Sequence, residues 1–528
     1  MEAAANQLVL QLDQLVVAYP SCSEPTLQGL TLQLHRGERV ALVGPSGCGK
    51  STVAKAVLQL LPPGSKSSGG LLLCNQDPRI LRPKALNKLR GEAVGLVFQD
   101  PMTRLNPLLS IGGHLTDTLR AHRPGVAREQ VRQRAEDLLQ RVGITADRFN
   151  NYPHEFSGGM RQRVAIALAM ALNPPLVIAD EPTTSLDVAV AAQVMAELCS
   201  LCDELGSALL LISHDLALAG KWCEQMAVLE QGRLLEQGSV NQVLQNPQQP
   251  LTKRLVAAAR RREGGDTPKS PEAAVVLELH QVRCWHRLPS LPWRSRWLKS
   301  VDGVSLRLHA AETLGLVGPS GCGKSTLCRA LMGLNPLRGG EVLLLGKPLA
   351  VASQRMQMVF QDPLACLNPV MDVQRAIADP LLIHRMATKA AARSMALALM
   401  DAVGLPASFA SRLPRELSGG QQQRVAIARA LILKPSVLLC DESVSMLDAE
   451  IQADVLELLR DLQHQFGLGI IFVTHDLGLA SGFCHRLIIL NQGKIVEEGP
   501  GDKLLRNPLA EITKQLVAAS PRLPQLVV

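Results

Sequence analysis

The chain has few aromatic residues. Only 3% of its 528 residues are aromatic, among them two tyrosines and four tryptophans. Its basic residues gather at 260–262 and between Arg283 and Lys299. Neither place shows the interleaved aromatic side chains on which single-stranded nucleic acids stack. The net charge of +8 favours an acidic partner without identifying one. We therefore expect no nucleic-acid partner.

Long hydrophobic runs are also missing. No stretch approaches the roughly 18 consecutive apolar residues that a membrane-spanning helix needs. The richest runs, such as 165–172, 208–212 and 469–473, are short enough to be core helices or buried strands. No basic and apolar leader of an exported protein is seen. The sequence thus predicts a protein of the cytoplasm.

Cysteine is too sparse for a disulfide framework, since twelve are spread over the chain. Cys199 and Cys202 form one C-x-x-C in a helical-looking run, 193–205, with no second pair at zinc spacing. We expect two thiols packed on a helix and no metal or redox site there.

What the chain does contain is an internal duplication. The octapeptide Gly-Pro-Ser-Gly-Cys-Gly-Lys-Ser occurs at 44–51 and at 318–325, and later landmarks repeat 261 or 262 residues apart. The repeat predicts two domains, 1–260 and 275–528. They are joined by a charged, turn-prone linker, 261–274. Between the loop lysine and the next landmark, a glutamine, the second half is about a dozen residues shorter, as surface loops tolerate.

Strand and helix signals alternate within each half. The run 39–43 predicts a strand that ends at the octapeptide, and 51–61 predicts the helix after it. Continuous apolar runs at 176–179 and 437–440 are typical of buried parallel strands. The pattern predicts an α/β fold with a mainly parallel sheet.

The octapeptide is a phosphate-binding loop. Its glycines let backbone N–H groups turn toward phosphate oxygens at a helix N-terminus. Lys50 and Lys324 are expected to reach the β- and γ-phosphates, and the hydroxyls of Ser51 and Ser325 to bind Mg²⁺.

Acidic pairs and histidines follow buried strands in both halves. A carboxylate at the carboxyl end of a parallel strand lies at the ligand-binding edge of the sheet. We expect Asp180 and Asp441 to hold magnesium through water. Glu181 and Glu442 are expected to polarise the attacking water as general bases. We expect the histidines of the two halves, His214 and His475, to contact the γ-phosphate.

A Ser-Gly-Gly sequence opens a long amphipathic helix in each half, at 157–159 and 418–420. Alone it is either an ordinary helix cap or an anion site at a helix N-terminus. Pairing with a phosphate loop favours the anion site.

With these motifs the chain resembles the ATP-binding cassette (ABC) family, twice and over nearly its whole length. The resemblance assigns Walker A to Gly44–Ser51 and Gly318–Ser325, and Walker B to Asp180–Glu181 and Asp441–Glu442. It assigns the signature to Ser157–Gly159 and Ser418–Gly420. It assigns the Q-loop to Gln99 and Gln361, the D-loop to Asp187 and Asp448, and the switch histidine to His214 and His475.

The resemblance implies two tandem nucleotide-binding domains, each with a RecA-like core, an antiparallel β-subdomain and an α-helical signature subdomain. It implies ATP and Mg²⁺ at two head-to-tail composite sites, each made by one Walker A loop and the other half's signature. The expected magnesium ligands are Ser51, Gln99, Asp180, Ser325, Gln361 and Asp441. The expected nucleotide-binding residues, besides the Q-loop, signature and D-loop positions above, are Tyr19, Gly44, Pro45, Ser46, Gly47, Cys48, Gly49, Lys50, Ser51, Thr52, Gly318, Pro319, Ser320, Gly321, Cys322, Gly323, Lys324, Ser325 and Thr326; the signature contributes Ser157, Gly158, Gly159, Ser418, Gly419 and Gly420.

Finer details resemble the ATPases of peptide and nickel importers, in a fused form similar to those of glutathione and microcin C uptake. This implies integral-membrane permease subunits, an extracytoplasmic solute-binding protein and a peripheral place on the cytoplasmic face of the membrane. Many members of that branch carry a cysteine-rich tail, and neither tail does here. The alternative is a soluble twin-cassette protein acting on the ribosome or nucleic acid. Such proteins typically have a long helical linker, unlike the short join here.

The two halves also differ. Tyr19 matches the family's aromatic platform for adenine. In the second half His286 aligns there with Trp285 beside it, and the sequence does not choose between them. The run 288–297 reads more simply as a packed surface loop than as a contact to lipid headgroups or a partner. Ser443 follows Glu442 where Pro182 follows Glu181, and our hypothesis is that the second site hydrolyses more slowly.

Overall fold

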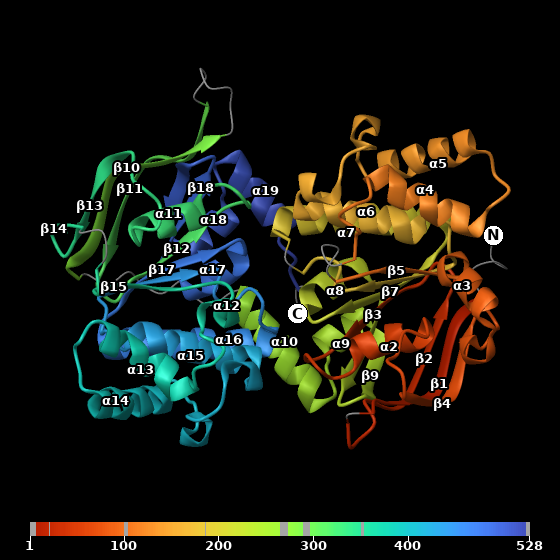
Figure 1. Cartoon of the computed structure of the whole chain (residues 1–528), viewed down its shortest axis with the longest axis horizontal. Helices are drawn as coiled ribbons and strands as arrows, with labels where there is room; N and C mark the ends of the chain where they lie inside the picture. The colour runs from red at the N-terminus through yellow and green to blue at the C-terminus, as the bar shows by residue number, and fades with distance from the viewer. Residues whose placement is uncertain are drawn as a thin grey trace. The chain divides into compact units, whose positions relative to one another are not determined.

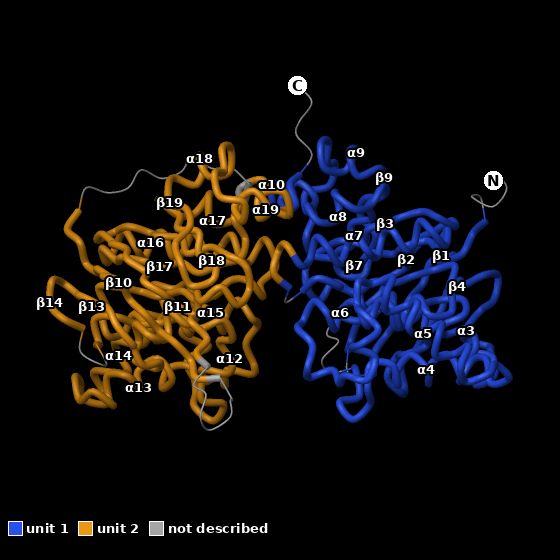
Figure 2. Tube along the Cα trace, turned by 90° about the horizontal axis from the view of Figure 1, so that it is seen from above, with its two compact units in different colours: residues 1–186, 190–259, 521–528 blue, residues 187–189, 260–520 orange. Residues whose placement is uncertain are grey.

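The computed structural model describes residues 7–20, 22–99, 104–184, 186–263, 273–288, 296–349 and 353–523. The chain forms two compact units, residues 1–186, 190–259 and 521–528 in the first and 187–189 and 260–520 in the second (Figure 2). Each unit combines a six-stranded sheet, a smaller antiparallel sheet and a group of helices (Figure 1). The predicted α/β class is confirmed, with both predicted subdomains present.

The large sheet of the first unit has the strand order β5-β6-β7-β3-β8-β9. Its strands are β3 (Arg39–Val43), β5 (Val94–Val97), β6 (Leu176–Asp180), β7 (Ala208–Ser213), β8 (Gln225–Glu230) and β9 (Arg233–Ser239). All pairs are parallel except β8 with β9. β7 is buried throughout, as a strand covered on both faces should be. Since β3 lies between β7 and β8, the carboxyl ends of β3, β6 and β7 meet at one edge.

The large sheet of the second unit repeats this order as β15-β16-β17-β12-β18-β19. Its strands are β12 (Thr313–Val317), β15 (Met356–Val359), β16 (Val437–Asp441), β17 (Gly469–Thr474), β18 (Arg486–Asn491) and β19 (Lys494–Gly499). Val317 is paired with Thr474 just as Val43 is paired with Ser213, so the register is conserved between the units.

The antiparallel sheets have the orders β2-β1-β4 and β11-β10-β13-β14. Their strands are β1 (Leu8–Ala18), β2 (Leu27–His35) and β4 (Lys66–Leu73) in the first unit, and β10 (Val275–Leu288), β11 (Arg296–His309), β13 (Gly339–Leu344) and β14 (Lys347–Pro348) in the second. Leu10 is paired with Leu73 and Leu277 with Leu344. The strand register therefore supports the alignment of Leu10 with Leu277.

The helices of the first unit cover the sheet and build the signature subdomain around α4, α5 and α6 (Figure 1). They are α2 (Lys50–Val57), α3 (Pro83–Glu92), α4 (Ile111–His122), α5 (Arg128–Arg141), α6 (Gly158–Met170), α7 (Val188–Leu205), α8 (Leu216–Trp222), α9 (Val240–Gln245) and α10 (Pro250–Glu263), with 3-10 turns η1 (Pro78–Ile80), η2 (Ala146–Arg148) and η3 (Pro153–Glu155). α5 buries Val131, Ala135, Leu138 and Leu139. That spacing is one helical stripe, which explains why α5 packs with one face inward.

The second unit has a similar helical layout, without a described counterpart of η1 and α3. Its helices are α11 (Lys324–Leu331), α12 (Pro363–Cys366), α13 (Val373–Ile383), α14 (Lys389–Ala402), α15 (Gly419–Leu431), α16 (Ala449–Phe466), α17 (Leu477–Phe483), α18 (Gly501–Arg506) and α19 (Glu511–Ala519), with η4 (Ala407–Phe409) and η5 (Pro414–Glu416). Among the described residues of both units, no helix is long and apolar enough to cross a bilayer.

The extra dozen residues of the first half fold as η1 and α3. The guanidinium of Arg90 donates to the carbonyl oxygens of Leu58 at 2.9 Å and Gln59 at 2.8 Å. These carbonyls follow α2 and have no helical partner, so the added segment ties down the end of the phosphate-loop helix. At the join, α10 continues to Glu263, and 264–272 lie outside the described residues.

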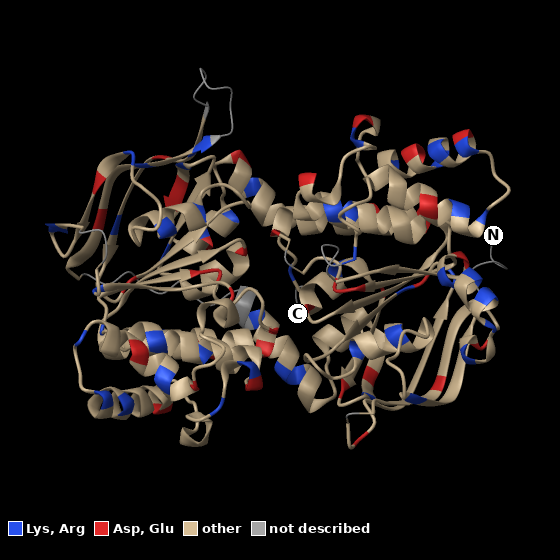
Figure 3. Ribbon diagram, in the orientation of Figure 1, with Lys and Arg blue, Asp and Glu red and all other residues tan. Residues whose placement is uncertain are grey.

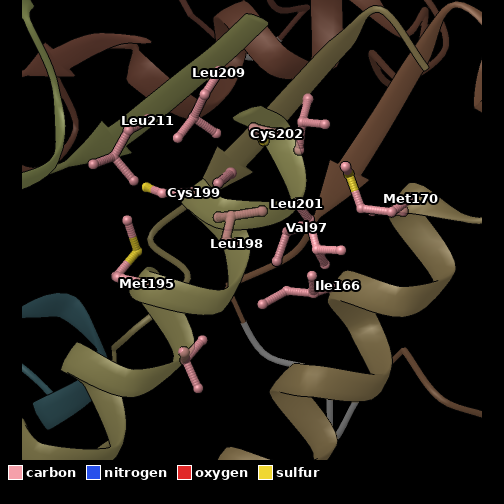
Figure 4. Packing of buried hydrophobic residues seen from close by; sticks show 14 of the residues in the cluster. Val97, Ile166, Met170, Met195, Leu198, Cys199, Leu201, Cys202, Leu209 and Leu211 are labelled. Atoms are coloured by element: carbon pink, nitrogen blue, oxygen red, sulfur yellow. The ribbon is translucent and has the colours of Figure 1, made fainter. Parts of the chain in front are cut away.

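The core of the first unit lies between the sheet and helices α6 and α7 (Figure 4). Val97, Leu209 and Leu211 of the sheet meet Ile166 of α6 and Leu198 of α7, and each is 0% exposed.

Cys199 and Cys202 project from α7 into this core and are buried, as predicted. Burial raises the pKa of Cys199 to about 11 and that of Cys202 to about 12, so both thiols stay protonated and unreactive.

A glutamate on the last strand of each sheet holds the start of a C-terminal helix. The carboxylate of Glu236 on β9 accepts from the backbone N–H groups of Gln248 at 2.9 Å and Gln249 at 3.1 Å, just before α10. Glu497 on β19 accepts from Leu509 at 2.9 Å and Ala510 at 3.0 Å, just before α19. Each carboxylate satisfies N–H groups that a helix start leaves unpaired.

Candidate functional site

The phosphate loop leads from the end of β3 to the start of α2. Gly47 and Gly49 have φ of 79° and 108°, a region where glycine is favoured. The Nζ of Lys50 donates to the carbonyl oxygens of Gly44 at 2.8 Å and Pro45 at 2.9 Å. The lysine is therefore folded over the loop, and the loop crest at Ser46 and Gly47 is exposed.

The second unit has the same arrangement between β12 and α11. Lys324 donates to Gly318 at 2.7 Å and Pro319 at 3.0 Å. Ser320 and Gly321 form the exposed crest, while Cys322 and Gly323 are buried. Both predicted loops thus present backbone N–H groups at the N-terminus of a helix, where an anion is favoured.

Gly44 tests the packing of the loop. A Cβ added there would lie 2.2 Å from the carbonyl oxygen of Leu229, whereas one added at Gly47 meets nothing within 4 Å. Gly44→Ala should push the loop away from β8 and lose nucleotide at the first site. Gly47→Ala should cost only about 1–2 kcal/mol of backbone strain. Equilibrium dialysis with an ATP analogue should show about half the bound nucleotide for Gly44→Ala. Equal binding by both variants would contradict this packing argument.

A serine–aspartate pair lies beside each loop. The Oγ of Ser51 donates to Oδ1 of Asp180 at 3.0 Å, and that of Ser325 donates to Asp441 at 2.9 Å. Burial raises the pKa of both aspartates, and the serine hydrogen bonds offset this in part. A hydroxyl and a carboxylate in contact are the hard oxygen ligands that Mg²⁺ prefers.

The residue after each aspartate is a glutamate in the left-handed region, with φ of 47° for Glu181 and 48° for Glu442. Such backbone is costly for a residue with a side chain and clusters at functional sites. It is held by a hydrogen bond from the backbone N–H of Glu181 to Ile212 at 2.9 Å, and of Glu442 to Val473 at 3.1 Å.

Three side chains meet the carboxylate of Glu181. Gln99 donates to Oε2 at 2.9 Å, Thr184 donates to the same oxygen at 3.1 Å, and Nδ1 of His214 lies 3.1 Å from Oε1. Burial alone would raise the pKa of Glu181, but the hydrogen bond and charge of His214 outweigh it and lower the pKa. Glu181 is therefore an ionised carboxylate, as a general base must be.

The second unit brings the same groups together with fewer bonds. Gln361 donates to Oε2 of Glu442 at 3.0 Å, and Nδ1 of His475 lies 3.5 Å from Oε1. Burial again opposes and His475 lowers the pKa of Glu442. Ser445 stands in the place of Thr184 but donates to the backbone oxygen of Glu442 at 2.8 Å. Sequence reasoning missed the role of this position, although the Thr-to-Ser difference between the repeats was a visible signal.

The signature residues lie apart from these groups in the fold, at the starts of α6 and α15. Ser157 accepts from the backbone of Met160 at 3.4 Å, and the backbone N–H of Ser418 donates to Gln421 at 3.0 Å. A Cβ on Gly159 would lie 2.2 Å from Val190, which explains that glycine by packing.

Gly158 has no such neighbour, since an added Cβ would meet only Leu186, at 3.4 Å. In the second unit Gly420 would clash with Ile451 at 2.4 Å, whereas Gly419 would meet Leu447 at 3.6 Å. Ser157, Gly158, Ser418 and Gly419 are exposed. Both helix starts are therefore open to solvent, as an anion site at a helix N-terminus requires.

The remaining predicted residues lie near these elements. Asp187 is buried directly before α7, and Asp448 is the N-cap of α16. The hydroxyl of Tyr19 forms a hydrogen bond of 3.2 Å with Thr52 on the phosphate-loop helix. Within the second unit, Lys299 lies over the ring of Trp285, 4.9 Å from its centroid.

The sequence profile of ABC transporters matches residues 27–184 and 301–445. A peptidoglycan transport ATP-binding protein, YejF of Agrobacterium fabrum, is 39% identical over 98% of this chain and 98% of its own length. The oligopeptide transport ATP-binding protein OppD of Mycobacterium tuberculosis is 34% identical over 97% and 98%. The glutathione import ATP-binding protein GsiA of Escherichia coli is 35% identical over 97% and 89%. With a complete set of Walker, glutamine and histidine positions in each unit, the chain belongs to the ABC transporter family as a two-cassette, nucleotide-binding ATPase.

Proposed function

We propose that the chain is the ATP-hydrolysing subunit of an importer, which drives uptake of a peptide or other small solute through separate membrane permeases. The observation that carries the proposal is that both units, not one, keep the full arrangement of lysine, Ser–Asp pair and Gln–Glu–His cluster. The names of the relatives support import of peptide-like solutes and do not favour the ribosome or nucleic-acid alternative.

In this proposal the domains 1–260 and 275–528 pair head to tail, as the family resemblance implies. Each loop lysine leaves its carbonyl partners to bind the β- and γ-phosphates. Ser157–Gly159 and Ser418–Gly420 bind the γ-phosphate of the opposite unit from their helix starts. Mg²⁺, held by Ser51, Gln99 and Asp180 and by Ser325, Gln361 and Asp441, would neutralise charge on the phosphates.

The two glutamates do the chemistry. Glu181 and Glu442 accept a proton from water as it attacks the γ-phosphate, and His214 and His475 orient them and contact the phosphate. We expect the permeases to dock near Gln99 and Gln361, whose side chains contact the two glutamates and so link docking to hydrolysis. Binding of ATP closes the two units and hydrolysis releases them, so the γ-phosphate acts as a switch. The chain would act peripherally on the cytoplasmic face of the membrane, with an extracytoplasmic binding protein delivering the solute.

The role in import is tested by reconstitution. The chain is combined in proteoliposomes with candidate permease subunits and a candidate solute-binding protein. We expect ATP turnover to rise when the solute is added, together with accumulation of solute inside the vesicles. Turnover that is insensitive to the permeases would overturn the importer assignment while leaving the ATPase intact.

The metal role has its own test. Chelation should abolish turnover, and Mg²⁺ should restore it. Ser51→Ala combined with Ser325→Ala should raise the Mg²⁺ concentration for half-maximal turnover by about tenfold or more. Ser65→Ala, which removes a hydroxyl that donates to Pro62 away from the site, is the control and should leave that concentration unchanged.

A further inference from the structure

The duplication allows the surfaces of the two units to be compared position by position. One end of the β10–β11 sheet in the second unit carries four cations and two tryptophans, and we call these six residues the hairpin patch. They are Arg283, Trp285, Arg287, Trp297, Lys299 and Arg338. Figure 3 shows Lys and Arg at this end of β10 and β11.

The patch lies on one face of the sheet. Arg283, Trp285 and Arg287 alternate along β10, and Cys284 between them is 0% exposed on the opposite, core side. Arg287 is paired with Trp297 across the ladder, so these two side chains share the outward face.

Cation–π contacts join the patch into one surface. Lys299 lies 4.9 Å from the ring centroid of Trp285, and the guanidinium of Arg338 lies 4.9 Å from that of Trp297. The backbone N–H of Arg338 also donates to the carbonyl of Arg283 at 2.8 Å. The charged groups are therefore held in place on indole faces.

The cations of the patch face solvent. All four are exposed, and Lys299 has Asp302 at 3.7 Å as an acidic neighbour. Trp297 is 39% exposed, and Leu337, next to Arg338 in sequence, is 38% exposed. The surface thus combines concentrated positive charge with exposed indole and aliphatic area.

The fold does not require this composition. Ladder partners align Val17 and Leu27 with Cys284 and Val301. By ladder partners, Val16, Ala18 and Ser67 of the first unit take the positions of Arg283, Trp285 and Arg338 and are uncharged. The strands β1 and β2 of the first unit do not reach the positions of Arg287, Trp297 and Lys299. The patch is therefore a feature of the second unit, and none of its four cations belongs to the phosphate loop, the Ser–Asp pair or the Gln–Glu–His cluster. This argues that the cations have a role beyond nucleotide handling.

We propose that the hairpin patch binds a surface of anionic phospholipid headgroups, the less favoured of the two interpretations of the run 288–297, of which 289–295 lie outside the described residues. Guanidinium and ammonium groups attract the phosphates of an anionic leaflet, and indole rings prefer the boundary between headgroups and acyl chains. A partner bound by charge alone, such as an acidic peptide, would not account for the exposed apolar surface of Trp297 and Leu337. The contact goes beyond the proposed function because it needs no permease.

The test is sedimentation of the purified full chain with protein-free vesicles of phosphatidylcholine, with and without phosphatidylglycerol. Arg287→Gln combined with Arg338→Gln should lower partitioning onto anionic vesicles about fivefold per charge, or about 25-fold for the pair. Lys84→Gln with Lys88→Gln, which removes two exposed cations of α3, is the matched control and should change it little. Binding should weaken as added salt shortens the Debye length.

A second variant separates the contribution of charge from that of the exposed indole ring. Trp297→Ser, which removes the exposed indole, should weaken binding while keeping every charge. Equal binding by the wild type and the double arginine variant would overturn the proposal, as would equal loss in the α3 control. The lipid assignment also fails if soluble poly-glutamate or RNA binds the patch while anionic vesicles do not.

Discussion

Replacing Glu181 and Glu442 together by glutamine should lower ATP turnover by about 10²- to 10⁴-fold, the usual contribution of a general base. Glutamine keeps the size and can still accept a hydrogen bond, but it cannot take the proton of the attacking water. ATP binding should persist, because neither carboxylate belongs to the phosphate loop. Turnover by phosphate release and binding by dialysis measure the two effects separately.

The single variants should differ. Glu181 is held by Gln99, Thr184 and His214, whereas Glu442 lacks the threonine contact and its histidine lies farther away, at 3.5 Å. A better oriented base should turn over faster, so Glu181→Gln should remove more than half of the activity and Glu442→Gln less than half. Thr184→Val should bring the first site toward the rate of the second. Equal losses, or the reverse order, would refute the predicted inequality.

Removing the carboxylate of Glu312 should produce the largest loss of stability. Its side chain is 1% exposed and accepts from Nε of Arg486 at 3.0 Å and from the backbone N–H of His309 at 2.8 Å. Glu312→Ala takes this partner from Arg486, which still donates to Glu498 and to the carbonyl of Arg307, so we expect a loss of about 1–3 kcal/mol of unfolding free energy in the second unit. Hydrogen exchange of the β12 and β18 amides at increasing denaturant concentration measures the stability of the second unit specifically.

The first unit supplies the control. Glu38 occupies the equivalent position, where its side chain is 42% exposed, and Gln225 stands in place of Arg486. Glu38→Ala should cost less than about 1 kcal/mol. A comparable loss at both positions would show that the ion pair is not the cause.

The same carboxyl predicts a pH effect. Burial would raise the pKa of Glu312, but Arg486 and His309 hold it below its ordinary value of 4.5. A lowered folded-state pKa stabilises the fold above the ordinary value, and this contribution is lost as the pH falls through the folded-state pKa. The wild type should therefore lose stability below about pH 4.5 more steeply than Glu312→Gln.

The sequence predicted the features that are made by contiguous residues. The strand at 39–43, the loop at 44–51 and the Asp-Glu pair at 180–181 are contiguous, and their chemistry follows from residue type and order. The helix predicted at 51–61 instead spans 50–57, because Gln59 takes the left-handed region with φ of 52°. Apolar periodicity continues through Leu60 and Leu61 and does not reveal such a break.

Features made by distant residues could not be predicted. Arg338 stacks on Trp297 because β11 and β13 flank β10 in the sheet, and neighbours along the chain do not indicate that contact. The left-handed backbone of Glu181 depends on a bond to β7, and η1 and α3 were expected only as surface loop. The pairing of the two halves rests on the family resemblance, because no pattern within one unit reveals that its site is completed by the other unit.

The glutamate anchors of the two tail helices have an evolutionary consequence. Glu236 and Glu497 accept hydrogen bonds from main-chain amides at 248–249 and 509–510, so at these positions they constrain the path of the chain and leave the residue type open. The residues that donate these amides differ between the units: they are Gln-Gln at 248–249 and Leu-Ala at 509–510. Only proline is excluded at these positions, because it has no amide hydrogen to donate. Other substitutions at these four positions therefore keep the anchoring hydrogen bonds, so each tail can change in sequence and stay attached to its sheet.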